Sequence, residues 1–135
     1  MKAKELRYAV GLSTDGVLRV EDGPPLEPPA EWTPEHLLLA ALTRCSLESL
    51  RHHASRASLT VVSAQGYARS LVTRREDDGR YAVVEADLEL NVELSPPPAA
   101  DDLGALLAKA QRDCFVGASL RITPSYHWTV NGAVV

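Results

Sequence analysis

The sequence predicts an α+β fold, in which a largely antiparallel sheet is covered by a long buried helix and a second helix. Three observations support this fold. Turn residues separate runs in which apolar and polar side chains alternate, two segments have apolar residues at helical spacing, and the order along the chain is ββ–α–βββ–α–β. The length of 135 residues fits a single domain, residues 1–135, with one hydrophobic core.

The first two strands are predicted at residues 6–10 and 17–20, on either side of the turn residues Ser13-Thr14-Asp15-Gly16. The next stretch, residues 21–29, contains four of the nine prolines of the chain. Proline lacks the backbone donor that a sheet needs and stiffens the chain. We therefore expect this stretch to be an extended loop.

A long helix of about twenty residues is predicted to begin at Thr33-Pro34-Glu35. Thr33 can cap the free backbone amides, and proline at the first helical position has a suitable φ. Residues 37–42 are apolar nearly all round the helix, which favours burial between the sheet and a further surface. A partner subunit is the simplest candidate for that surface. His52 and His53, near the polar end of the helix, are expected on the protein surface.

Strands are predicted next at residues 59–62 and 67–72, followed by a charged, solvated turn at residues 75–80. The return strand has apolar side chains at every second position from Val84 to Leu94, so one of its faces meets the core. Three prolines end it, and Asp101 or Asp102 can cap the second helix. The apolar stripe of that helix consists of Leu103, Leu106, Leu107, Ala110 and Cys114. The tail predicts strands at residues 120–123 and 126–130, ended by Asn131-Gly132.

Charge and hydropathy exclude several classes of protein. Fourteen basic against eighteen acidic residues give a formal net charge of −4, so the chain lacks the basic surface that binds nucleic acid. No stretch approaches the ~18 consecutive apolar residues that cross a membrane. We therefore expect a cytoplasmic protein with neither nucleic acid nor membrane as a partner.

The two cysteines, Cys45 and Cys114, are the candidate chemical groups, and neither has metal-ligand spacing. They could be buried apolar residues, a structural bridge, or a reactive pair in which one thiol resolves the oxidised form of the other. A reactive pair needs a cation near one thiol. Arg44, the sequence neighbour of Cys45, points about 100° away from it on a helix. An arginine from the first hairpin, Arg7 or Arg19, is a better candidate.

The run Thr33-Pro34-Glu35-His36-Leu37-Leu38-Leu39-Ala40-Ala41-Leu42-Thr43-Arg44-Cys45 resembles the signature of the OsmC/Ohr family, the osmotically inducible and organic hydroperoxide resistance proteins. The upstream hairpin, the late second cysteine and the length also agree, so the resemblance covers essentially the whole chain. It implies an OsmC-like fold and an intertwined homodimer with active sites at the subunit interface. The implied activity is that of a thiol-dependent peroxidase that reduces organic hydroperoxides, with no metal or organic cofactor.

The resemblance also implies roles for four residues. Cys45 is the thiol that attacks the peroxide, and Cys114 resolves its sulfenic acid as a disulfide. Arg7 lies eight positions before Asp15, as the catalytic arginine of the family does, and Glu35 stands where the glutamate partner of that arginine stands. The reductant is a thiol compound, for which a dihydrolipoyl protein is one candidate.

Several features leave alternatives open. Phe115 follows Cys114, where hydroperoxide resistance proteins usually have proline. Glu48 lies on the same helix face as Cys45, where a carboxylate disfavours a thiolate unless it pairs with His52. On a continuous helix Glu35 lies about 15 Å along the axis from Cys45, which favours Glu35 serving the site of a second subunit or a break in the helix. The alternative function is a non-catalytic dimer of the same fold that binds a small apolar ligand at the subunit interface.

Overall fold

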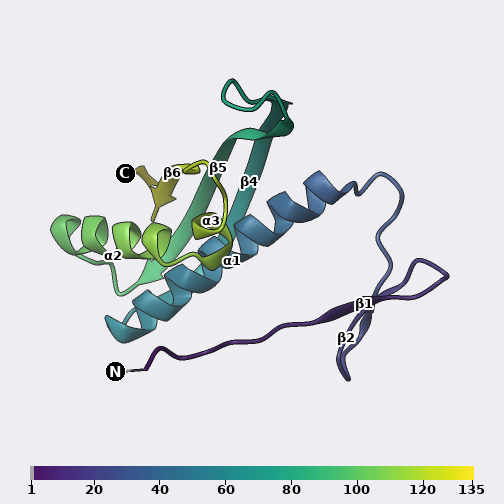
Figure 1. Cartoon of the computed structure of the whole chain (residues 1–135). Coiled ribbons are helices and arrows are strands. Elements are labelled where there is room, and N and C mark those ends of the chain that lie inside the picture. The colour runs from purple at the N-terminus through teal and green to yellow at the C-terminus, as the bar shows by residue number, and fades with distance from the viewer. Residues whose placement is uncertain (1) are drawn as a thin grey trace. The chain divides into compact units, whose positions relative to one another are not determined.

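The computed structural model describes residues 2–135, which form two compact units that meet in sequence between Glu35 and His36. Figure 1 shows the elements of each unit. Along the chain they are β1 (Val10–Leu12), β2 (Leu18–Val20), β3 (Pro25–Leu26), α1 (Pro34–Arg56), β4 (Thr60–Arg74), β5 (Tyr81–Ser95), α2 (Ala100–Arg112), α3 (Phe115–Ala118), β6 (Ser125–Val130) and β7 (Ala133–Val134). No helix within residues 2–135 is long and apolar enough to cross a bilayer.

The first unit contains a small antiparallel sheet in the order β1-β2-β3. It confirms the predicted hairpin, although its first strand begins at Val10 and not at Leu6. The turn closes through a hydrogen bond from Gly16 N–H to Ser13 O at 3.0 Å, and Gly16 has a φ of +83°, which glycine adopts without strain. The expectation that residues 21–29 form only a loop is wrong, because Pro25–Leu26 pairs with β2. Proline is tolerated there since β3 lies at the edge of the sheet.

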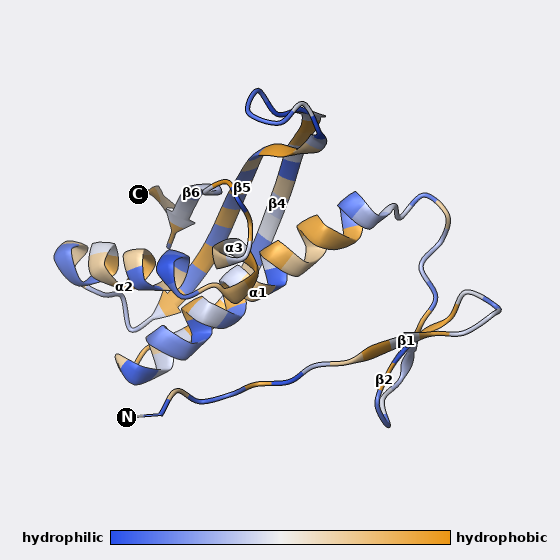
Figure 2. Cartoon of the chain, in the orientation of Figure 1, coloured by the Kyte–Doolittle hydropathy of each residue, from blue (hydrophilic) through white to orange (hydrophobic). Residues whose placement is uncertain are grey.

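The first unit leaves most of its apolar side chains in solvent, and Figure 2 shows the hydrophobic colour along β1. Val17 is buried, but Tyr8 is 83% exposed and Leu12 is 71% exposed. The other exposed large apolar residues of this unit are Leu6, Val10, Val20, Leu26 and Trp32. A segment of this length is too short to enclose a core of its own.

The second unit has a four-stranded sheet in the order β4-β5-β6-β7. Strands β4 and β5 form a long antiparallel hairpin, β5 and β6 are parallel, and β6 and β7 are antiparallel. The predicted strands at 59–62 and 67–72 are one strand, because a bulge between Val61 and Ser63 absorbs the break in the alternation. The strand predicted at 120–123 is absent, since these residues belong to the crossover that the parallel pairing requires.

The core lies between this sheet and the helices. Figure 1 shows α1 and α2 on the same side of the β4–β5 hairpin. The predicted alternation along β5 is confirmed from Ala86 to Leu94, where every second side chain is buried. The core residues of the helices are Leu42 and Leu50 of α1 and Leu106, Leu107 and Ala110 of α2.

Small residues on β4 bring α1 close to the sheet. Gly66 pairs with Leu90, and the neighbouring inward positions of β4 are alanine. A Cβ atom on Gly66 would lie 3.2 Å from Thr43 Cγ2 of α1 and 2.7 Å from Leu90 Cδ2. At Thr43, two residues before Cys45, α1 therefore packs closely against the backbone of β4. This contact sets the distance between Cys45 and the sheet.

The second helix differs from its prediction at both ends. Its N-cap is Ala99, which makes no side-chain cap, and Asp101 and Asp102 lie inside the first turn. The three prolines before Ala99 hold the chain extended up to the helix, so neither aspartate occupies the cap position. The helix ends at Arg112, and Cys114 instead caps the short helix α3, which was not predicted.

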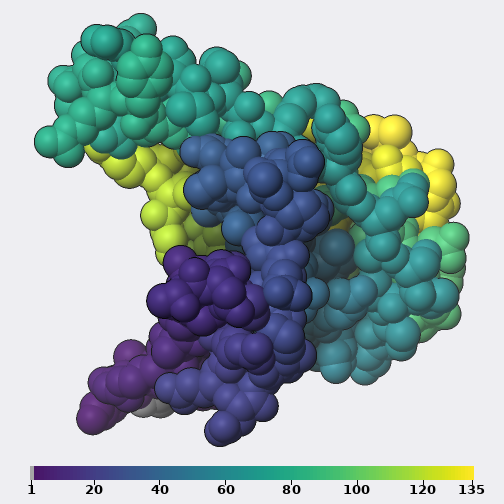
Figure 3. All heavy atoms as spheres, turned by 90° about the vertical axis from the view of Figure 1, so that its right-hand side faces the viewer, coloured from purple at the N-terminus to yellow at the C-terminus, as the bar shows by residue number. Residues whose placement is uncertain are grey.

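The sequence predicted a solvated tip for the β4–β5 hairpin, and in the structure charged side chains of this tip also form ion pairs. Arg75 donates to Asp78 Oδ2 at 2.6 Å within the tip. Arg121, in the segment after α3, donates to Asp77 Oδ2 at 3.0 Å. In Figure 3 the teal tip accordingly lies beside the yellow-green segment that follows α3.

Candidate active site

The fold brings the two cysteines together although they are 69 positions apart, which follows from 114 − 45. Cys45 lies in the middle of α1 and is half-buried, and Cys114 caps α3 and is fully buried. The segment that begins at Cys114 contacts Cys45, because Val116 N–H, two residues after Cys114, donates to Cys45 Sγ at 3.5 Å. Both cysteines are free thiols. Cys45 confirms its predicted place on a helix face, whereas Cys114 lies beyond the helix predicted to hold it.

Backbone amides of α3 point at both sulfur atoms. Val116 N–H donates to Cys45 Sγ at 3.5 Å, and Gly117 N–H donates to Cys114 Sγ at 3.4 Å. Amides in the first turn of a helix have no acceptor within the helix, so the two sulfur atoms act as their acceptors. Sequence reasoning missed this feature, because α3 is only four residues long. A glycine three residues after a cysteine is a weak signal for it.

The electrostatic environment of Cys45 favours its neutral form. Burial is the main cause that raises the pKa of the Cys45 thiol above its ordinary value, and the neighbouring Cys114 thiol adds to the rise. The hydrogen bonds from the amides of Val116 and Phe115 oppose it. Phenylalanine at position 115 therefore supplies a donor that proline would lack. The amides of α3 therefore do not by themselves bring the pKa of Cys45 below its ordinary value.

The sequence left open whether Glu48 pairs with His52, and the carboxylate instead lies beside Arg44. Its Oε1 lies 3.6 Å from Nη2 of Arg44, one turn earlier on α1. Both side chains of the pair are largely exposed to solvent. Burial, and not Glu48, is the main cause of the raised pKa of Cys45.

A cleft of about 410 Å³ opens beside Cys45. Its lining comes from the second half of α1 and from the segment around α3. The lining residues are Cys45, Glu48, Ser49, His52, His53, Asp113 and Phe115. The exposed ring of Phe115 gives the cleft an apolar wall.

On one side of this cleft lies an ion pair, His53–Asp113, that the sequence did not predict. His53 was expected on the surface, but its side chain is only 14% exposed, and its Nε2 lies 2.8 Å from Asp113 Oδ2. The Arg112 guanidinium, followed by His53, lowers the pKa of Asp113 to about 2. Ser49 Oγ donates to Ala110 O at 2.8 Å. Together these contacts fasten α1 to the segment that carries Cys114.

Comparisons with known proteins agree with this geometry. A family model described as OsmC-like protein matches residues 27–128, which is most of the chain. The chain belongs to the OsmC-like protein family. A comparison with curated proteins found no match.

Solved structures of OsmC-like proteins share the fold. An OsmC-like protein of unknown function from Vibrio cholerae is 17% identical with a TM-score of 0.74, over 94% of this chain and 100% of that chain. An OsmC-like protein from Mycoplasma pneumoniae is 15% identical with a TM-score of 0.70, over 96% and 99%. The organic hydroperoxide resistance protein OhrB of Bacillus subtilis is 17% identical with a TM-score of 0.58, over 93% and 96%.

The two other site residues that the OsmC/Ohr resemblance implies belong to the first unit. Arg7 is exposed, and its Nη2 donates to Glu5 Oε2 at 2.7 Å. Glu35 is exposed in the first turn of α1, which is continuous from Pro34 to Arg56, so the helix break considered above is absent. The approach of Arg7 or Glu35 to a thiol of this OsmC-like protein stays a prediction.

Proposed function

We propose that this OsmC-like protein is a thiol-dependent peroxidase that reduces organic hydroperoxides. The observation that supports this function best is the unequal exposure of two neighbouring thiols. Cys45 borders an open cleft, and the fully buried Cys114 lies behind it. An accessible thiol can meet a peroxide, while a protected neighbour can only meet the oxidised product.

The reaction follows from this arrangement. The Cys45 thiolate attacks one peroxide oxygen, the O–O bond breaks, and the alcohol leaves with a proton while Cys45 becomes a sulfenic acid. The Cys114 sulfur then attacks Cys45 Sγ, so that the S–O bond breaks and water leaves as the disulfide forms. A dithiol reductant, for which a dihydrolipoyl protein is one candidate, restores both thiols.

Activation of Cys45 is the role that we assign to Arg7, oriented by Glu35. The raised pKa of the Cys45 thiol makes a cation necessary, and a guanidinium also binds the peroxide oxygens that gain charge. We propose that a second copy of the chain covers the apolar side chains of the first unit and completes the site. Light scattering should then give twice the chain mass of 14.6 kDa, whereas a monomer would contradict the dimer.

The apolar wall of the cleft supports an organic substrate. Phe115 is 62% exposed beside Cys45, and an alkyl or aryl tail would bury part of that surface. We therefore expect cumene hydroperoxide to be consumed faster than hydrogen peroxide. We also propose that the protein acts in the cytoplasm, where reductants keep thiols free.

Consumption of cumene hydroperoxide with dithiothreitol as reductant tests the function. The wild type should turn over, and Cys45→Ser should abolish turnover. Arg7→Ala should lower the rate on the order of 100-fold, and the same substitution at Arg19 decides between the two arginines. A wild type that leaves the hydroperoxide intact, with its fold preserved, would contradict the proposed activity.

The raised pKa of Cys45 also favours the second candidate function, a non-catalytic dimer that binds a small apolar ligand. In that case both thiols behave as apolar residues. Thiols that survive excess hydroperoxide in the native dimer would support this function over the peroxidase.

A further inference from the structure

Beside Cys114 lie a buried hydroxyl group of Ser46 and a partly buried one of Tyr126, and the proposed reaction leaves both without a role. Ser46 is 1% exposed, and its Oγ lies 2.9 Å from the hydroxyl oxygen of Tyr126. The same Oγ lies 3.6 Å from Cys114 Sγ. Ser46 follows Cys45 directly on α1, and Tyr126 comes from β6, so the hydroxyl that contacts Cys114 Sγ is itself bonded by a hydroxyl from a separate element.

The serine can switch its single proton between two acceptors. It donates to Leu42 O at 2.8 Å, a carbonyl that the helix already bonds through the Ser46 amide. With the serine proton used there, the Tyr126 hydroxyl is the donor of the bond to Ser46 Oγ. Rotation of the serine hydroxyl alone then turns its proton from Leu42 O to the sulfur.

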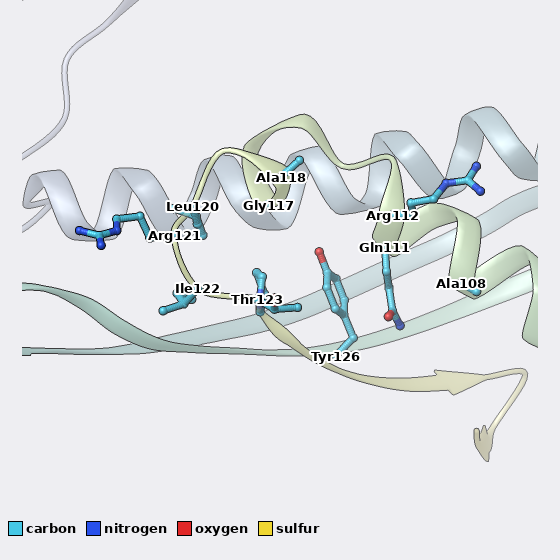
Figure 4. A pocket seen from close by; sticks show the side chains of 11 residues that line it. Ala108, Gln111, Arg112, Gly117, Ala118, Leu120, Arg121, Ile122, Thr123 and Tyr126 are labelled. Atoms are coloured by element: carbon cyan, nitrogen blue, oxygen red, sulfur yellow. The ribbon is translucent and has the colours of Figure 1, made fainter. Parts of the chain in front are cut away.

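Packing fixes the orientation of the Tyr126 ring. Its ring stacks on Trp128 with a centroid separation of 5.9 Å and an interplanar angle of 7°. Figure 4 shows Tyr126 rising from β6 toward the segment of α3 that contains Gly117. A Cβ atom on Gly117 would lie 3.5 Å from both the Tyr126 hydroxyl and Cys114 Sγ. The Tyr126 hydroxyl therefore lies near Cys114 Sγ and bonds the serine that contacts this sulfur.

We propose that Ser46, oriented by Tyr126, is the hydroxyl donor that supports negative charge on Cys114 Sγ. This inference rests on the proposed function and names the residues that serve its second step. When Cys114 attacks the oxidised Cys45, its sulfur first loses a proton and then forms the S–S bond. When a dithiol attacks Cys45 Sγ in the disulfide, the S–S bond breaks and its electron pair returns to Cys114 Sγ. In both directions the anionic sulfur accepts hydrogen bonds from Ser46 Oγ and from the amide of Gly117.

A mixed disulfide isolates this step from peroxide chemistry. Dithiobis(nitrobenzoate) first reacts with the accessible Cys45 and releases one coloured thionitrobenzoate. Cys114 Sγ then attacks Cys45 Sγ, which releases a second thionitrobenzoate and leaves the disulfide. Stopped-flow absorbance resolves the two releases of thionitrobenzoate in time. The rate of the first release measures the reaction of Cys45, and the rate of the second measures the resolving step.

Ser46→Ala should slow the second release about tenfold or more and leave the first release unchanged, because a hydrogen bond to a charged atom is lost. Tyr126→Phe keeps the ring on Trp128 and should slow the second release to a smaller extent. The matched control is Thr43→Val, since Thr43 Oγ1 donates to Leu39 O at 2.8 Å, as Ser46 does to Leu42 O, but Thr43 has no bond to either sulfur.

A second release from Ser46→Ala that is as fast as that from Thr43→Val would overturn the inference. So would a wild type without a second release. A Ser46→Ala variant that slows both releases equally would also overturn it, because the serine would then act on the fold and not on Cys114. Failure of the proposed peroxidase is distinguishable, since it would leave cumene hydroperoxide unreduced while both releases still occur.

Discussion

Gly66→Ala tests the close packing of α1 on β4, which sets the position of Cys45. In an open helical position the change from glycine to alanine stabilises a protein by about 0.5–1 kcal/mol. At Gly66 the new methyl group would meet Thr43 Cγ2 at 3.2 Å and Leu90 Cδ2 at 2.7 Å. Such overpacking costs about 1–3 kcal/mol, so we expect a lower free energy of unfolding.

Urea denaturation measures this difference, at equal protein concentrations because the proposed dimer would make apparent stability depend on concentration. Gly104→Ala is the matched control, since a Cβ atom on Gly104 of α2 has no neighbour within 4 Å. This control should gain about 0.5–1 kcal/mol. Thr43→Ser removes the methyl group at 3.2 Å, so it should restore part of the stability of Gly66→Ala. A Gly66→Ala variant as stable as the wild type would refute the packing argument.

Three further predictions concern stability. Ser49→Ala should lower the free energy of unfolding by about 1 kcal/mol in urea titrations, because the hydrogen bond to Ala110 O is lost. Leu88→Ala, at a fully buried position, should cost about 2–5 kcal/mol in the same assay, whereas exposed Glu85→Ala should stay within about 0.5 kcal/mol. The pKa of Asp113 lies at about 2, below its ordinary value of 3.8, because a guanidinium and an imidazole bond to its carboxylate. The stability that Asp113 contributes is thus present above pH 4 and lost as the pH falls from about 4 to about 2, so the difference between wild type and Asp113→Asn should shrink across that window.

Much of the fold could be predicted from local patterns. The alternation from Ala86 to Leu94 and the helix start at Pro34 are confirmed, because both depend on side-chain periodicity and local backbone preferences. The single long strand β4 could not be predicted, since its inward positions are small and its alternation is weak around Gly66. The parallel pairing of β5 and β6 depends on contacts distant in sequence.

The candidate site could be predicted only in part. A reactive pair was one of three interpretations of the two cysteines, and the resemblance gave each thiol its role. The structure places both sulfur atoms at the amides of α3, and their redox roles stay a prediction. The amide of Val116 reaches Cys45 Sγ and the hydroxyl of Tyr126 reaches Ser46 through tertiary packing, which no short sequence pattern encodes. His53 was assigned to solvent because its partner, Asp113, lies 60 positions later.

The proposed function depends on a redox pair formed by Cys45 and Cys114. Intact mass and free-thiol count, before and after one equivalent of cumene hydroperoxide, test it most directly on the reduced native protein and on Cys114→Ser. We expect loss of two hydrogens and both thiols in the wild type, and a sulfenic acid on Cys45 in Cys114→Ser. Two intact thiols in the folded wild type after excess hydroperoxide would contradict it.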